Sequence, residues 1–324
     1  MRDLLPVIEL LEDVRVVVLG DVMLDTYVWG NVSRISPEAP VPVFAVVERT
    51  FQPGGAANAA AGIAALGGSV GVGGLVGADE AAETLRGTLA SHGVSGDGVV
   101  SDGERPTTTK TRFIATNQQV VRVDEESQVP LREETAEELL EWARRRLTNA
   151  HAALLSDYGK GTVTPRVAAA FVAAAHEAGL PVVVDPKGPD FTKYAGATVV
   201  TPNVREAREA SRIRDQDAAL DEVAADLRGS LDGAALLVTR GAAGMRLYRE
   251  GHEPQEIPAL AREVYDVTGA GDTVTATLAA ALGRGVALAD AVRLAAAAAA
   301  VAVGHIGAAR VTPGELRRTL DSDA

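Results

Sequence analysis

The sequence of 324 residues contains no cysteine, which excludes disulfide bonds, thiolate zinc sites and cysteine nucleophiles. Aromatic residues are scarce at 4%, and basic residues number 31 against 44 acidic ones, giving a net charge of −13. This charge argues against a nucleic acid or an anionic membrane as the partner. An anionic small substrate stays open, but it requires a local cluster of lysine or arginine.

Long hydrophobic segments are also absent. The longest apolar run, residues 294–303, is too short and too rich in alanine to be a membrane span. The N-terminus has charged residues at positions 2, 3, 9, 12 and 13 and lacks the apolar core of a signal peptide. We therefore expect a soluble cytoplasmic protein.

Several catalytic motifs are missing too. The chain has no G-x-x-x-x-G-K-[ST] loop, no correctly placed G-x-G-x-x-G, no H-E-x-x-H and no G-x-S-x-G at a strand-to-helix elbow. Its five histidines are scattered. These absences exclude Walker-type NTPases, zinc peptidases of the H-E-x-x-H type and hydrolases with a nucleophile elbow.

What is present is an alternation of apolar strands and helices. Strands are predicted at 14–21, 69–77, 152–158, 181–188, 197–203 and 234–241, and helices at 54–68, 79–92, 164–179, 204–212 and in two segments that close the chain. Strands that are apolar on both faces and alternate with helices indicate an α/β fold with a mostly parallel sheet covered on both sides.

Two segments, 40–50 and 105–124, break this alternation because they are β-branched and half-polar with no helix between strands. We interpret them as antiparallel strands of a small β-lid beside the main sheet. A lid over the strand ends suits an active site that excludes water. The alternative is an ordinary edge hairpin.

Polar residues gather where the predicted strands end. In open α/β sheets, ligands bind outside the carboxyl ends of the strands. One polar strand end is readily explained as a turn, but six in succession favour a shared site. The residues are Asp21, Asp25, Gly54, Gly55, Asn58, Asp157, Lys160, Asp185, Lys187, Asn203, Glu206 and Asp272.

The segment VYDVTGAGDTV places Gly269, Ala270, Gly271 and Asp272 between an expected strand end at 264–267 and an apolar helix. Backbone N–H groups at a helix start lack intrahelical partners and can bind an anion. Alternatively, Asp272 caps the helix and the glycines only form the turn. These residues alone leave both interpretations open.

The strings GGAAN and DVTGAGD resemble the two signatures of ribokinase-type (PfkB) sugar kinases, in the right order across nearly the whole chain. Longer strings, including SDYGKG and VVDPKGPDFTKYAGATVVTPN, resemble the kinase half of the bacterial D-glycero-β-D-manno-heptose 7-phosphate kinases of ADP-heptose synthesis. Many of those kinases are fused to an adenylyltransferase. No H-x-G-H motif occurs here, so we expect a stand-alone kinase.

The resemblance implies a single three-layer ribokinase-like domain over residues 1–324, with lid strands from about 40–50 and 105–124. It also implies ATP-dependent phosphorylation of a sugar hydroxyl. Asp272 would be the catalytic base, and Gly269, Ala270 and Gly271 would hold the anionic transition state. Another sugar, or a non-catalytic sensor on this fold, remains an alternative.

The resemblance further implies ligand sites. Asn203 and Glu206 would bind the nucleotide and hold Mg²⁺ through water, with Thr239, Gly241 and Gly244 in the nucleotide loop. Asp21, Asp25, Gly54, Gly55 and Asn58 would bind the sugar. Asp266 aligns with a ligand for a monovalent cation such as K⁺ in some relatives, although a turn residue is the simpler interpretation.

The substrate phosphate needs positive charge, for which the candidates are Lys110, Lys160, Lys187, Arg34 and Arg112. Each lysine could equally be an ordinary surface residue. The string GHIGAARVTP departs from the Gly-Thr-small-x-Val pattern of heptose kinases, since Ala308 and Ala309 lack hydroxyls and Arg310 adds a charge. Exposed lid edges lead us to expect a homodimer.

Overall fold

The main sheet has nine strands in the order β13-β12-β11-β10-β9-β8-β1-β4-β5. The computed structural model describes residues 1–322 except 117, 128, 130, 214, 216–217, 261–263, 306 and 308–309. The pairs from β5 to β11 are parallel, and β12 and β13 add an antiparallel edge. The strands are β1 (Arg15–Gly20), β4 (Ser69–Val76), β5 (Ser95–Ser101), β8 (Ala152–Ser156), β9 (Val182–Asp185), β10 (Val199–Val200), β11 (Ala235–Thr239), β12 (Met245–Tyr248) and β13 (Gln255–Ile257).

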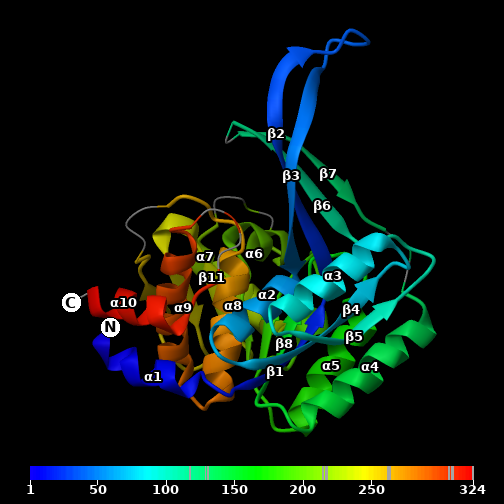
Figure 1. Cartoon of the computed structure of the whole chain (residues 1–324). Coiled ribbons are helices and arrows are strands. Elements are labelled where there is room, and N and C mark those ends of the chain that lie inside the picture. The colour runs from blue at the N-terminus through cyan, green and yellow to red at the C-terminus, as the bar shows by residue number, and fades with distance from the viewer. Residues whose placement is uncertain are drawn as a thin grey trace.

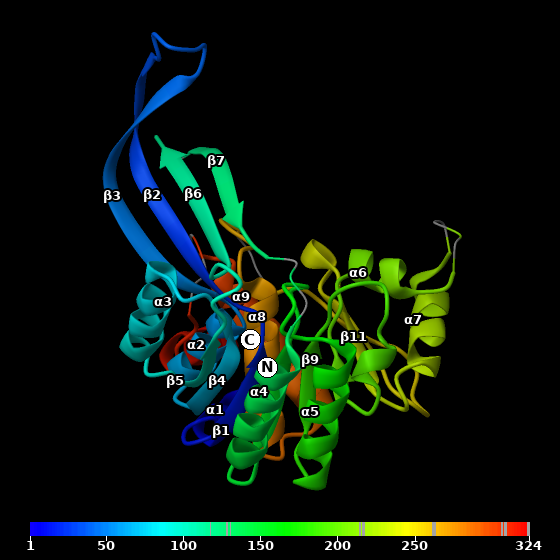
Figure 2. The same ribbon diagram turned by 90° about the vertical axis from the view of Figure 1, so that its right-hand side faces the viewer.

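Helices cover both faces of this sheet (Figure 1, Figure 2). Along β1, Val16 and Val18 join the core on one side, and Val17 and Leu19 join the core on the other, so the strand is apolar throughout. One side holds α1 (Leu5–Leu10), α2 (Ala56–Ala65), α3 (Glu80–Ser91), α8 (Ala270–Gly283), α9 (Leu288–Ala302) and α10 (Pro313–Ser322). The other holds α4 (Glu133–Leu147), α5 (Pro165–Glu177), α6 (Val204–Ala210) and α7 (Leu220–Gly229).

A second sheet of four strands stands away from the main body as the predicted lid (Figure 1, Figure 2). Its order is β3-β2-β6-β7, from β2 (Val22–Ile35), β3 (Pro42–Gly55), β6 (Thr109–Ala115) and β7 (Gln118–Glu125). Two of its pairs are antiparallel, as expected, but β2 and β6 pair in parallel. The 14-residue strand β2 was missed because its first residues follow β1 directly and resemble a strand end.

Two other expectations were wrong. Residues 264–267 form no strand, and Val264, Tyr265 and Val267 are exposed. Their β-branched and aromatic side chains are typical of a buried strand, but within the described residues this segment pairs with no strand, and the Tyr265 amide donates to the Val303 carbonyl of the α9 end instead. Three helices rather than two close the chain, because α10 follows α8 and α9. None of the helices in the described ranges has the length and apolarity needed to cross a bilayer.

Trp142 of α4 lies against two glycines that face each other across β4 and β5, Gly73 and Gly98. A Cβ on Gly98 would lie 2.3 Å from the indole ring. We expect Gly98→Ala to destabilise the protein by about 1–3 kcal/mol through overpacking. Urea unfolding measures this change.

The matched control is Gly87→Ala in the exposed part of α3, where a Cβ meets nothing within 4 Å. There the substitution should stabilise by about 0.5–1 kcal/mol, because alanine is the better helix former. Equal effects at the two positions would contradict the packing described for Trp142.

Candidate active site

Asp272 lies in the first turn of α8, three residues after the N-cap Gly269, which adopts a left-handed conformation with φ of 76°. Its side chain is 6% exposed and does not cap the helix. Oδ2 accepts a hydrogen bond from Asn58 Nδ2, and Oδ1 accepts one from the Tyr158 hydroxyl, both at 2.6 Å. The interpretation of Asp272 as a helix cap is therefore wrong.

These surroundings set the pKa of Asp272. Burial raises it to about 6, and the charge of Asp25 adds to the increase, while the bonds from Asn58 and Tyr158 oppose it. The charge of Asp272 in turn helps to raise the pKa of Asp185. A carboxylate with a pKa just below neutral pH is ionised in the cell and accepts a proton more readily than an ordinary aspartate.

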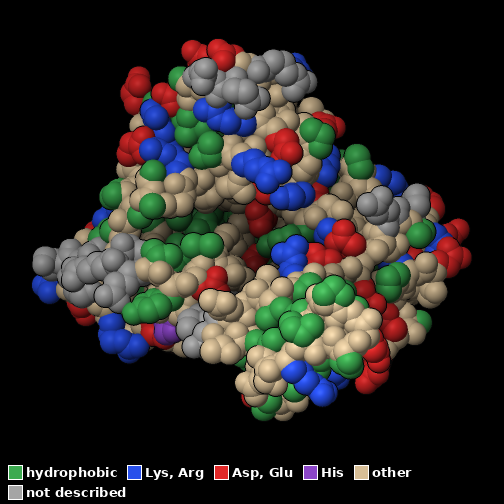
Figure 3. Space-filling view, turned by 90° about the horizontal axis from the view of Figure 1, so that it is seen from above, with side chains coloured by type: hydrophobic (Ala, Val, Ile, Leu, Met, Phe, Trp, Pro, Cys, Tyr) green, Lys and Arg blue, Asp and Glu red, His purple; other side chains and the backbone are tan. Residues whose placement is uncertain are grey.

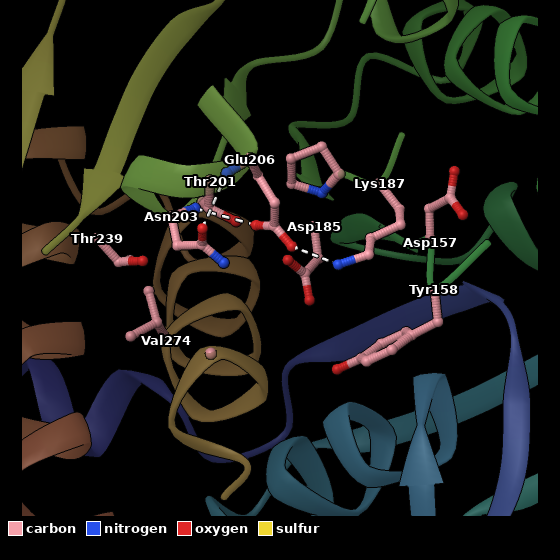
Figure 4. A pocket seen from close by; sticks show the side chains of 11 residues that line it. Asp157, Tyr158, Asp185, Lys187, Thr201, Asn203, Glu206, Thr239 and Val274 are labelled. Carbon is pink, nitrogen blue, oxygen red and sulfur yellow. Dashed lines mark hydrogen bonds and ion pairs between the residues drawn. The ribbon is translucent and has the colours of Figure 1, made fainter. Parts of the chain in front are cut away.

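The start of α8 opens onto a pocket that Gly271 and Val274 help to line (Figure 4). A Cβ added to Gly271 would meet nothing within 4 Å, so the backbone faces open space there. The first amides of a helix are unpaired and carry the positive end of its dipole. The turn can thus present N–H donors to an anion beside a proton acceptor.

The opposite wall of this pocket carries the residues predicted to serve the nucleotide (Figure 4). Asn203 and Glu206 form a capping box at the start of α6, and an isolated parallel bridge joins the backbones of Asn203 and Thr239. Lys187 Nζ lies 2.8 Å from Glu206 Oε1. The structure therefore brings Lys187 together with Asn203 and Glu206.

Asp185 at the end of β9 also faces this pocket, between Tyr158 and Glu206 (Figure 4). Its carboxylate has no hydrogen-bond partner among the described residues. Burial, together with the charges of Asp272 and Glu206, raises its pKa well above the usual range. A bound cation would relieve this repulsion, so Asp185 belongs with Glu206 as an acidic group facing the pocket.

The donor set suits Mg²⁺ held partly through water. Glu206, Asn203 and Asp185 offer carboxylate and amide oxygens, the ligands that this hard cation prefers. Within the described ranges, no three or more acidic or histidine side chains converge tightly enough to hold a metal ion on their own. A cation here would keep several water ligands, as Mg²⁺ commonly does.

The remaining predicted nucleotide residues, Gly241 and Gly244, lie in the turn between β11 and β12. Gly244 has a φ of 81°, and a Cβ there would lie 2.2 Å from the Ile257 carbonyl oxygen. The turn requires glycine at position 244 whether or not a nucleotide binds, so a role in nucleotide binding stays a prediction.

The predicted sugar residues meet at the foot of the lid. Asp25 is 7% exposed, and Arg112 Nη1 donates to its Oδ1 at 2.8 Å. Gly54 lies beside it, where a Cβ would come within 2.9 Å of the Asp25 carboxylate, and Gly55 follows at the start of α2. Asp21 differs, because its buried carboxylate accepts bonds from the backbone amides of Tyr158, Lys160 and Thr162.

Every lysine of the chain is paired with a carboxylate. Nζ of Lys110 lies 2.9 Å from Asp124 Oδ2, and Nζ of Lys193 lies 2.6 Å from Asp157 Oδ2. Lys160 pairs with Glu126, and Lys187 with Glu206 as above. The lysines proposed for the substrate phosphate are thus already neutralised in this structure.

Asp266 closes a turn. Its Oδ1 accepts bonds from the backbone and hydroxyl of Thr268, and its Oδ2 accepts one from the amide of Gly307. These bonds account for Asp266 as a turn residue, and a monovalent-cation role stays a prediction. Ala308 and Ala309 lie outside the described residues.

Tyr158, which bonds directly to Asp272, is a pocket residue that the sequence did not assign to the site, whereas Asp185 stood among the polar strand ends without a specific role. Tyr158 follows β8 at the edge where ligands were expected, so the strand-end rule could have included it. The bond from Tyr158 to Asp272 spans 114 residues and left no local signal.

Comparison with known proteins places the chain among sugar kinases. A family model described as pfkB family carbohydrate kinase matches residues 13–314. A protein named Bifunctional protein HldE from Geobacter metallireducens is 45% identical over 318 residues, and its Azorhizobium caulinodans namesake is 48% identical over 312. These matches cover 96% and 95% of this chain but only 65% of each relative's length.

Solved structures show the same fold. Ribokinase of Arabidopsis thaliana, solved with ribose and ATP, matches with a TM-score of 0.73 and 22% identity, covering 95% of this chain and 99% of that one. Phosphofructokinase-2 of Escherichia coli matches with a TM-score of 0.77 and 19% identity, covering 96% and 99%. The predicted ribokinase-like fold is confirmed.

The bond from Tyr158 to Asp272 predicts a titration change. Because this bond favours the ionised carboxylate, Tyr158→Phe should raise the pKa of Asp272 further above about 6. Carboxyl ¹³C NMR of labelled aspartate measures it, with the Asp272 signal assigned from Asp272→Asn. Tyr248→Phe is the control, since the Tyr248 hydroxyl donates to Asp221 at the far edge of the sheet. An unchanged or lower pKa in Tyr158→Phe would refute the interaction.

Proposed function

The chain belongs to the pfkB family of carbohydrate kinases, and we propose that it transfers the γ-phosphoryl group of ATP to the C1 hydroxyl of D-glycero-D-manno-heptose 7-phosphate. The product would be the 1,7-bisphosphate. The observation that carries the chemistry is the buried Asp272 carboxylate beside the open first turn of α8. The heptose substrate is supported by the 45% identity to HldE proteins and by the strings quoted from the sequence.

In this mechanism, Asp272 accepts the proton of the attacking hydroxyl as its oxygen forms a bond to the γ-phosphorus. The bond from that phosphorus to the β,γ-bridging oxygen breaks, and ADP leaves. Amides at the start of α8 stabilise the negative charge on the transferred group. Asn58 and Tyr158 hold the carboxylate in one orientation throughout. The proton then passes from Asp272 to solvent.

Asn203, Glu206 and Asp185 are the residues that would hold Mg²⁺, which would neutralise phosphate charge during transfer. The pairing of Lys187 with Glu206 limits the repulsion among these acidic groups. The lid would cover the sugar and exclude water, which otherwise competes as acceptor. A cytoplasmic location, predicted from the sequence, fits a reaction that consumes ATP.

A panel of acceptors tests the substrate. ADP release should be fastest with D-glycero-D-manno-heptose 7-phosphate and far slower with ribose, fructose and fructose 6-phosphate. A faster reaction with another sugar would favour the alternative of a different sugar kinase. No ADP release above background with any sugar would favour a sensor.

Replacing the proposed base gives a second test. Asp272→Asn keeps the side-chain size but removes the proton acceptor, so we expect kcat to fall by about 10²–10⁴ while nucleotide binding is largely kept. Asp290→Asn is the control, because Asp290 lies at the same position in the first turn of α9. Near-normal turnover by Asp272→Asn would rule out the assignment.

We also infer that the chain forms a homodimer through its lid. The face of the lid that does not carry Asp25 exposes Phe51, Val121 and Val123, whose accessible fractions are 42–48%. The strands β3 and β7 are the two edges of the lid sheet. Exposed apolar residues on an open sheet edge favour pairing with another copy.

Light scattering should therefore give twice the chain mass of 33.5 kDa for the wild type. The double variant Val121→Asp/Val123→Asp should run as a monomer, because it places charges on the apolar face. Val264→Asp, an exposed residue outside the lid, is the control. A dimer that survives the double variant would show that the contact lies elsewhere.

A further inference from the structure

Arg310 is a half-buried cation with no carboxylate partner. No described acidic group lies within ion-pair distance of its guanidinium. Its only hydrogen bond to a described residue runs from Nη2 to Gln52 Oε1 at 2.7 Å, and its Nε is buried without a partner. Burial alone lowers the pKa of Arg310, with no opposite charge to offset it. An unpaired guanidinium in this setting is costly unless a ligand completes it.

The place of Arg310 is set by Gln52. Gln52 on β3 lies directly opposite Asp25 on β2, so their side chains share one face of the lid. Tyr27, two residues beyond Asp25, lies opposite Arg112 on β6, and the bond from Arg112 to Asp25 confirms that Arg112 shares this face. Because Arg310 bonds to the Gln52 side chain, its guanidinium lies at the foot of the lid, on the same face as Asp25 and Arg112.

This face carries hydrogen-bond donors that are not used within the described part of the chain. Gln52 Nε2 and Arg310 Nη1 donate to no described acceptor, and Arg112 uses Nη1 but not Nη2. Seen from above, basic side chains lie along one side of the central hollow, and acidic side chains are visible inside it (Figure 3). Donors that no described residue engages therefore remain on the lid face that carries Asp25.

We propose that Arg310, Gln52 and the free edge of Arg112 form a binding site for the phosphate group at the far end of the sugar substrate. This proposal rests on the proposed function and deepens it. Two guanidinium groups and an amide suit a phosphate dianion, because charge-assisted bonds from arginine are strong and directional. Asp25 between this site and Asp272 would then bind a sugar hydroxyl, leaving the two ends of the substrate anchored separately.

The test compares the KM for the sugar phosphate with the KM for ATP. Arg310→Gln should raise the KM for heptose 7-phosphate about tenfold or more, while the KM for ATP changes less than about twofold. Arg284→Gln, an exposed arginine at the far end of α8, is the control. Arg34→Gln tests the alternative that Arg34, on the lid strand β2, binds the substrate phosphate. Equal changes in both KM values, or a larger effect from Arg34→Gln, would overturn the proposal.

Arg310 could instead be a structural latch between its loop and the lid, and Gln52→Glu distinguishes the two roles. A glutamate keeps the acceptor for Arg310, so a latch would persist and the melting temperature should not fall. The new carboxylate would neutralise the guanidinium and repel phosphate, so the KM for heptose 7-phosphate should rise as in Arg310→Gln. An unchanged KM in Gln52→Glu would contradict the proposal.

Inorganic phosphate provides a probe that does not depend on the heptose. Its binding is measured by calorimetry with a non-hydrolysable ATP analogue saturating the nucleotide site. Wild-type binding that is lost in Arg310→Gln and Gln52→Glu supports the site even if heptose 7-phosphate proves not to be the substrate. Equal binding by wild type and both variants, or none by wild type, overturns it.

Discussion

The hydrogen bonds to Asp272 from Asn58 and Tyr158 are the interaction on which the site depends, since they hold a buried charge at the junction of three elements. Asn58 comes from α2, Asp272 from α8, and Tyr158 from the loop after β8. A buried carboxylate without such partners is strongly destabilising, so these elements must be fixed closely against one another. Small residues allow this, since a Cβ at Gly62 of α2 would lie 3.3 Å from Ala276 of α8.

In a chain with a net charge of −13, the acidic groups of the interior determine which basic residues can bind an anionic substrate. Asp185 and Glu206 make the electrostatic potential of the pocket more negative. This favours a bound cation and the ion pair between Glu206 and Lys187. The lysines form ion pairs with carboxylates, as Lys193 does with Asp157. Arginine, which keeps its charge when half-buried, is then the residue left to meet a phosphate group.

Much of the fold could be predicted because its signals are local. The apolar run of β1 and the glycine-bounded α2 have clear patterns, and the strand-end rule correctly brought Asp25, Asn58 and Asp272 together. The strand expected at 264–267 failed because side-chain type alone does not show whether a partner strand exists. Tyr158 and the ion pairs of the lysines depend on contacts between residues distant in sequence, such as Lys193 with Asp157. No local pattern records them.

We propose that Asp272 and the amides at the start of α8 promote transfer of a phosphoryl group to the anomeric hydroxyl of a sugar phosphate. Phosphorus-31 NMR of a reaction with MgATP and D-glycero-D-manno-heptose 7-phosphate is the direct test. We predict ADP together with a new phosphate signal coupled to the anomeric proton, in amounts equal to the ATP consumed. ATP hydrolysis without a new phosphate ester, or an ester at another carbon, would contradict the claim.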